Sequence, residues 1–278
     1  MKFLKVATLA AVTALFLSNA AQAQEKVGII KAFLVKGNVS LVNNATGATE
    51  PLSRGREFNQ GYTVVTGSDS TALLLFSNGA SINVSPDSKL NVTEFEQAAY
   101  DPELGSFLRL KADPSVSKTV TNLEYGEVIG EVRKLSAGSS YTVNTPVASA
   151  GIRGTVWVVS FNPTTGRFET TNVTGDVFVT LSSGQVIPVP AEQTYVLVNF
   201  NGALESANPA ALARARQFLR IVEFFNRNVP SIPPIIVDPN TAVITQDTGE
   251  VPSENIPVPS VGNGPTPTTT PTSTDDVE

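Results

Sequence analysis

The chain has 278 residues, of which 41% are hydrophobic and 16% charged, and its formal net charge at pH 7 is −6. This composition is typical of a protein that buries a core, and an acidic charge without a Lys/Arg cluster argues against nucleic-acid binding. The sequence contains no cysteine and no histidine, which excludes disulfides, thiol nucleophiles and the commonest metal ligand. We therefore expect no metal and no cofactor.

The first residues have the pattern of a secretory signal peptide. Lys2 and Lys5 precede the apolar run 6–17, and Ala21-Gln22-Ala23 provides a small-x-small cleavage site. We predict a signal peptide over 1–23 and a periplasmic or secreted mature protein; the alternative is an uncleaved membrane anchor. No later stretch is apolar for long enough to form a membrane helix, so we expect no integral membrane segment after cleavage.

The chain from residue 27 to residue 198 has the pattern of short β-strands separated by turns. The predicted hairpins pair 27–35 with 39–42, 71–76 with 81–84, and 175–181 with 185–189. Asn78-Gly79, within the second hairpin, is the strongest short-range hairpin signal. Residues 97–119 are less regular, and we interpret them as an insertion or a longer loop. The run 127–135 fits a strand or a short helix, and its flanking glycines favour a strand.

Two different segments follow the β-rich region. Asn208 is a good N-cap and Pro209 suits the first helical position, which predicts an amphipathic helix within 206–228. We interpret its apolar stripe as packing on the β-domain and its arginines as a solvated face; the alternative is a helix that binds a partner or an anionic surface. Beyond it lie more than half of the chain's 19 prolines. We predict a disordered Pro/Thr-rich tail over 229–278, either a plain linker or a glycosylated spacer.

The stretch 144–159 is the most distinctive part of the chain. Thr145-Pro146 favours a turn, and glycines on both sides of Arg153 permit backbone conformations that a side chain would forbid. The valines around Trp157, the only tryptophan, indicate a buried strand. The candidate site residues are those of this motif: Pro146, Gly151, Arg153, Gly154, Thr155 and Trp157.

Arg153 has two interpretations. As a functional group, its planar guanidinium could hold a carboxylate or a phosphate with two hydrogen bonds. As a structural group, it would bond backbone carbonyls or pair with an acidic residue at a corner of the fold. We favour the structural role, because charged groups that enter a fold are usually paired. Trp157 is better explained as core than as a ligand platform.

Two segments together resemble the FecR-like domain family of bacterial envelope proteins. The first spans 55–92 and includes Gly61-Tyr62-Thr63-Val64-Val65-Thr66-Gly67 and the Asn78-Gly79 hairpin. The second includes Thr145-Pro146 and Gly151-Ile152-Arg153-Gly154-Thr155, and Gly175-Asp176-Val177 follows it. The resemblance implies an all-β, non-enzymatic domain, which we place at 24–205 as an antiparallel β-sandwich or β-roll.

The resemblance also suggests a function. The best-known family members pass an iron-siderophore signal from an outer-membrane receptor, through a membrane helix, to a sigma-factor regulator. This sequence has no membrane helix or cytoplasmic segment of that kind, so we do not expect the same route. Our first hypothesis is a binding or signalling-related module whose partner is an envelope protein or a glycan. The second is a structural, adhesin-like surface protein with a spacer tail.

Catalysis is the third hypothesis. Paired carboxylates could cleave polysaccharides without histidine, but the spacing of the acidic residues, Glu127 and Glu131 among them, selects no pair. We therefore expect no enzymatic activity.

Overall fold

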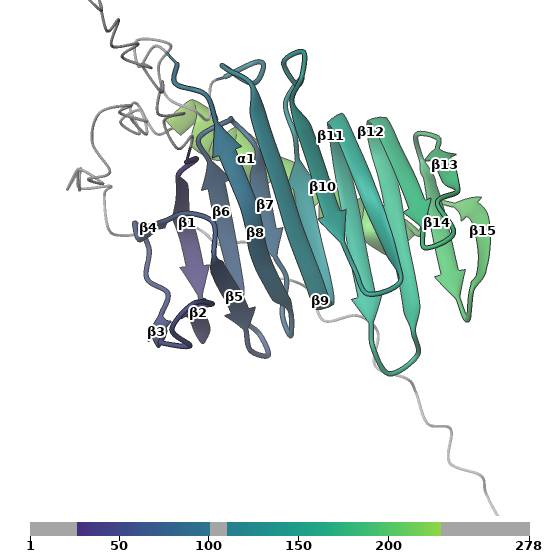
Figure 1. Ribbon diagram of the computed structural model, residues 1–278, viewed down its shortest axis with the longest axis horizontal. Coiled ribbons are helices and arrows are strands. Elements are labelled where there is room, and N and C mark those ends of the chain that lie inside the picture. Colours follow the sequence, from purple (N-terminus) through teal and green to yellow (C-terminus); the bar gives the residue numbers. More distant parts are fainter. Residues whose placement is uncertain (1–26, 101–109, 229–278) are drawn as a thin grey trace, which may run out of the picture. The chain divides into compact units, whose positions relative to one another are not determined.

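The computed structural model describes residues 27–100 and 110–228. These residues form fifteen strands and one helix (Figure 1). The elements are β1 (Ile30–Lys36), β2 (Val39–Asn43), β3 (Thr49–Pro51), β4 (Glu57–Phe58), β5 (Tyr62–Thr66), β6 (Thr71–Phe76), β7 (Ser81–Val84), β8 (Lys89–Gln97), β9 (Ser117–Glu131), β10 (Ser140–Asn144), β11 (Ala148–Asn162), β12 (Arg167–Leu181), β13 (Val186–Val189), β14 (Gln193–Val198), β15 (Asn201–Ser206) and α1 (Pro209–Asn228). The predicted signal peptide and the predicted tail lie outside the described residues.

The fifteen strands belong to one hydrogen-bonded sheet that folds over on itself into two layers. The helix-side layer has the order β4–β1–β6–β7–β9–β11–β12–β14–β15. The outer layer has the order β3–β2–β5–β8–β9–β10–β11–β12–β13. The predicted all-β fold is confirmed. One pairing departs from the predicted antiparallel pattern, because β10 runs parallel to β9.

Three long strands, β9, β11 and β12, cross from one layer to the other. Each carries a glycine with positive φ at its crossing point: Gly126 (93°), Gly154 (59°) and Gly175 (81°). A Cβ on Gly126 would lie 2.5 Å from the Ser88 Cα, and one on Gly175 would lie 2.4 Å from the Gly154 carbonyl oxygen. Neither position has room for a side chain, so glycine is required where these strands bend.

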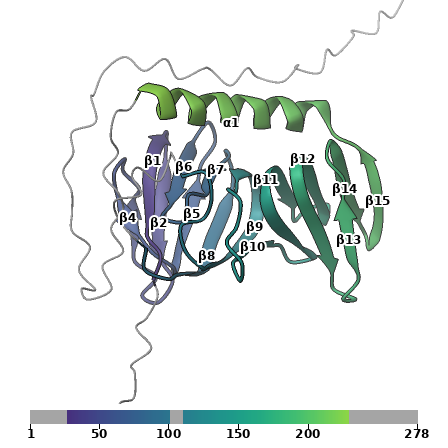
Figure 2. The same ribbon diagram turned by 90° about the horizontal axis from the view of Figure 1, so that it is seen from above.

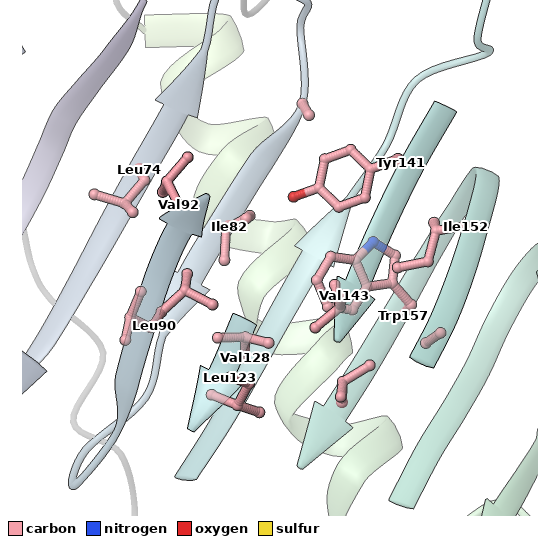
Figure 3. Close-up of a cluster of buried hydrophobic side chains, with 14 of the residues drawn as sticks. Leu74, Ile82, Leu90, Val92, Leu123, Val128, Tyr141, Val143, Ile152 and Trp157 are labelled. Atoms are coloured by element: carbon pink, nitrogen blue, oxygen red, sulfur yellow. The ribbon is translucent and has the colours of Figure 1, made fainter. Parts of the chain in front are cut away.

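The main hydrophobic core lies between the two layers. Leu74 and Ile82 of the helix-side layer belong to the same buried cluster as Leu90 and Val92 of the outer layer, although the strands that carry these two pairs are not hydrogen-bonded neighbours (Figure 3). Trp157 is fully buried in this cluster. The predicted core role of Trp157 therefore agrees with its position.

Helix α1 covers the face of the helix-side layer that points away from the main core (Figure 2). The Asn208 side chain accepts a hydrogen bond from the Ala210 N–H at 2.9 Å, which makes Asn208 the N-cap that the sequence indicates. Phe218 and Phe225 are buried beneath the helix, and the Phe225 ring meets that of Phe33 edge-on at 4.7 Å. Packing of the apolar stripe on the β-domain is thus observed.

The arginines of α1 do not all form a solvated face. The Arg214 guanidinium donates two hydrogen bonds to the Glu127 carboxylate, at 2.8 and 2.6 Å. Arg227 pairs with Glu223 at 3.6 Å on the helix surface. Arg216 and Arg220, in contrast, are exposed and form no ion pair with any described residue. Arg214 therefore fixes the helix to the bend of β9, a role that the sequence did not reveal.

The predicted hairpin of residues 27–35 and 39–42 is wrong. β1 pairs with β6 and β4, whereas β2 pairs with β3 and β5. The connection at Gly37-Asn38 carries the chain from the helix-side layer to the outer layer instead of turning back beside β1. The other two predicted hairpins, β6–β7 and β12–β13, are observed.

Candidate functional site

The predicted motif of residues 144–159 is divided in the structure. Pro146 lies in the turn between β10 and β11, where the Thr145 hydroxyl donates to the Ala148 carbonyl at 2.8 Å. The remaining motif residues follow along β11. Gly154 and Thr155 lie at the bend where β11 leaves the outer layer, so this part of the motif forms a corner. Pro146 lies apart from it, at the start of the strand.

Arg153 occupies the exposed side of this corner. It pairs in register with Asp176 of β12, yet its side chain makes no ion pair or hydrogen bond with any residue that the structure describes. The backbone of Lys134, also exposed, lies against the adjacent Gly154. The bonds that a structural role would use are therefore absent among the described residues, and the choice between the two interpretations of Arg153 stays a prediction.

A buried asparagine holds the inner side of the corner. The Thr155 hydroxyl lies 3.1 Å from Asn172 Oδ1, and both residues are buried. Asn172 Nδ2 donates to the carbonyls of Gly175 and Val189 at 2.9 and 2.8 Å. This amide satisfies one backbone oxygen at the bend of β12 and one at the end of β13. Sequence reasoning missed Asn172, because two of its three partners, Thr155 and Val189, are 17 residues away.

Trp157 packs against a glycine and a tyrosine. Its register partner on β9 is Gly130, where a Cβ would lie 2.3 Å from the indole Cζ2. The Tyr141 ring is 6.0 Å away on the other side, and burial raises the pKa of its hydroxyl. Neither the indole N–H nor this hydroxyl has a hydrogen-bond partner in the described part of the chain. Both aromatic groups are part of the buried core.

A cleft of about 400 Å³ opens at the end of the fold where β9 bends. Its lining comes from the β7–β8 turn, the bend of β9 and the β11–β12 hairpin: Asp87, Tyr125, Gly126, Ser160, Phe161, Asn162, Pro163, Arg167 and Glu169. Arg167 and Glu169 form an ion pair at its edge, with the arginine side chain 45% exposed. Aromatic, amide and charged groups thus meet in an open cavity. Such a lining can hold a loop of a protein or a sugar chain.

The carboxylates considered for catalysis are engaged in ion pairs. Glu127 binds Arg214, and Glu131 binds Arg133 at 2.5 Å. Burial raises the pKa of Glu131, and the nearby charge of Glu223 adds to this effect, while Arg133 opposes it. The two carboxylates are held by different arginines, and neither lines the cleft.

One buried acid was not singled out from the sequence. Asp113 accepts hydrogen bonds from the Ser117 and Ser139 hydroxyls, both at 2.7 Å, and is 5% exposed. Burial raises its pKa, although these hydrogen bonds oppose the rise. Burial and the charge of Asp113 together raise the pKa of Tyr100 to about 12. Asp113 thus links the start of β9 to the segment before β10 by hydrogen bonds, which is a structural role.

The residues that the structure describes contain no group of three or more acidic side chains placed to hold a metal ion. None of their helices combines the length and the apolar character that crossing a bilayer requires.

Comparison with known proteins connects this sandwich to a family. The family model described as FecR protein matches residues 62–186. No curated protein matches the chain. Two crystal structures of a candidate anti-sigma factor from Parabacteroides distasonis ATCC 8503, at 2.50 and 1.65 Å resolution, align with 15% identity and a TM-score of 0.41. The alignments cover 56% of this chain and 63% and 64% of those chains, which is less than two thirds of their length. The family match runs from the first residue of β5 to the first residue of β13, so residues 62–186 are the part of the chain that matches the FecR family.

Proposed function

We propose that this protein is an exported, non-catalytic binding module of the bacterial cell envelope, with a signalling-related role. The observation that carries the proposal is the FecR-family match over residues 62–186. The signal-peptide pattern at the N-terminus supports export. The partner is an envelope protein or a glycan.

We place the binding site in the cleft beside the bend of β9. All nine of its lining residues lie inside the matched segment. Tyr125 supplies a partly exposed aromatic ring, and Arg167 supplies an exposed cation that already has a carboxylate neighbour. Tyrosine and arginine are among the residues that most often dominate binding energy at interfaces, and both line this cleft. Tyr125 lies next to Gly126, whose positive φ forms the bend of β9 at the cleft.

The proposal is tested with the full chain bearing an affinity tag. Wild type, Tyr125→Ala and Arg167→Ala are incubated with crosslinked envelope fractions and, separately, with a glycan array. Arg56→Ala is the matched control, because Arg56 also forms an exposed ion pair, with Glu50, but lies outside the cleft. We expect one partner to be recovered with wild type and with the control, and to be lost with both cleft variants.

Two outcomes would contradict the proposal. Wild type that recovers nothing above background in either assay would argue against a binding module. Cleft variants that recover the same partner as the control would place the site elsewhere.

A further inference from the structure

The free edges of the sheet are not equally protected. β4 has only two residues, and β3 and β13 contain Pro51 and Pro188, which cannot donate to an added strand. β15, the last strand of the helix-side layer, has six residues, no proline and no lysine, and all six are exposed. Among the described residues only β14 pairs with it. β15 therefore lacks the usual devices that prevent a sheet from accepting another strand.

The turn that leads into β15 displays an aromatic ring in a strained conformation. Asn199 and Phe200 connect β14 to β15, with φ of 50° and 63°. Positive φ at both positions defines a type I′ turn, whose second position favours glycine. A bulky residue with positive φ is strained there. The Phe200 side chain is nevertheless 83% exposed, so packing within the described residues does not compensate for the strain.

The alternation of the β14–β15 ladder determines which backbone groups are free. The two-residue turn makes Val198 and Asn201 a hydrogen-bonded pair, so N–H and C=O of Gly202, Leu204 and Ser206 point away from β14. Leu204 is also 45% exposed. A row of alternating donors and acceptors beside exposed apolar side chains is complementary to an extended polypeptide.

The charge at this edge selects the kind of polypeptide. Glu205 is exposed on β15, and Glu192, also exposed, lies at the same end of the strand, where its carbonyl accepts the Ala207 N–H. Residues 193–206 contain no lysine or arginine. We propose that the β15 edge binds an extended, basic segment of a partner protein by strand addition, with Phe200 as an apolar anchor. This surface lies outside the FecR match and outside the cleft, so it is additional to the proposed function.

The probe is a synthetic peptide, Lys-Val-Thr-Val-Lys-Val-Thr, capped at both ends, with binding to the full chain measured by fluorescence anisotropy. Leu204→Pro removes a free N–H without touching the β14 ladder, and Leu204→Ala is its matched control because it keeps that N–H. We expect Leu204→Pro to weaken binding at least about tenfold and Leu204→Ala much less. A peptide with glutamate in place of lysine should bind at least about tenfold more weakly.

Phe200→Gly separates function from folding. Glycine removes the strain of the turn, so the melting temperature should rise while peptide affinity falls. A second test needs no variant: the same peptide, N-methylated at alternate residues, keeps its side chains but lacks the donors for strand addition and should not bind wild type.

Several results would overturn this inference. Absence of binding by the unmodified peptide, equal binding by the N-methylated peptide, or equal affinity of Leu204→Pro and Leu204→Ala would each do so. Light scattering over a dilution series covers one further case. If wild type forms dimers that Leu204→Pro abolishes, the edge pairs with a second copy, and the proposal of a basic partner segment is wrong. The cleft and the β15 edge share no residue, so the pull-down with the cleft variants tests the proposed function alone. The peptide measurements test the β15 proposal alone, and either proposal can fail without the other.

Discussion

Gly130 lies directly beneath the only tryptophan, so Gly130→Ala should destabilise the fold. The new Cβ would lie 2.3 Å from the Trp157 Cζ2 and 2.6 Å from its Cε2, well inside any ordinary contact. Trp157 is fully buried and flanked by the Tyr141 ring at 6.0 Å, so the indole cannot move aside freely. Overpacking of this kind costs about 1–3 kcal/mol, against a gain of up to about 1 kcal/mol from the less flexible unfolded chain.

The net effect is a loss of about 1–2 kcal/mol, or about 2–8 °C in melting temperature for a domain of this size. Denaturant unfolding followed by Trp157 fluorescence reports directly on the perturbed site, because no other tryptophan contributes. Gly151→Ala is the matched control. It too is a strand glycine without positive φ, but its nearest neighbour, the Phe178 carbonyl oxygen, is 3.7 Å from the added Cβ. We expect Gly151→Ala to change stability by no more than about 1 kcal/mol.

A third variant tests the cause of the clash. Phenylalanine has no atoms at the indole Cζ2 and Cη2 positions, so the cost of Gly130→Ala should shrink when it is measured in a Trp157→Phe background, followed by circular dichroism. The reasoning is refuted if Gly130→Ala is as stable as wild type, or if Gly151→Ala loses as much.

Three further predictions concern charged residues. Arg214→Ala should lower the free energy of unfolding by about 1–2 kcal/mol in denaturant unfolding, because it leaves the half-buried Glu127 without its arginine partner. This estimate already allows for the 39% exposure of the arginine side chain. Equal stability of this variant and Arg220→Ala would contradict it. The raised pKa of Asp113 means that the folded state binds a proton more readily than the unfolded state, so the stability of wild type relative to Asp113→Asn should rise as pH falls from 7 towards the ordinary value of 3.8. A flat difference across that range would show that the carboxyl does not titrate as described. Arg153→Ala should change stability by less than about 0.5 kcal/mol, because its side chain has no bond to a described residue; a larger fall in melting temperature would restore the structural role.

The local sequence predicted where strands and turns lie better than it predicted which strands pair. Asn78-Gly79 predicted the β6–β7 hairpin because the turn itself demands positive φ, which Gly79 adopts at 86°. Gly37-Asn38 has a similar pattern and Gly37 also has positive φ, but this turn leads into the other layer. The residues of a turn specify its backbone angles and not the strand that the chain will meet next, so this hairpin was predicted incorrectly.

The same limit explains which site residues were missed. The glycines flanking Arg153 correctly marked a special backbone, because an isolated glycine within a strand signals a bend. Asn172 and Asp113 gave no comparable signal. Asparagine and aspartate are common in surface turns, and here their burial depends on hydroxyls 17 and 26 residues away. Strand β15 was missed because Asn201–Ser206 lacks the β-branched and aromatic residues that indicate a strand.

The strands that cross between the layers also constrain how the chain can fold. β9 is the neighbour of β7 in one layer and of β8 in the other. The free edges of β7 and β8 therefore stay unpaired until residues 117–131 have been synthesised and have joined the sheet. Pairings of such long sequence separation fold slowly and leave strand edges open in the meantime. Once formed, the shared strands couple both layers, and amide hydrogen exchange should report one cooperative opening for the sandwich. This topology therefore makes the chain most prone to aggregation during synthesis, before β9 has paired with β7 and β8.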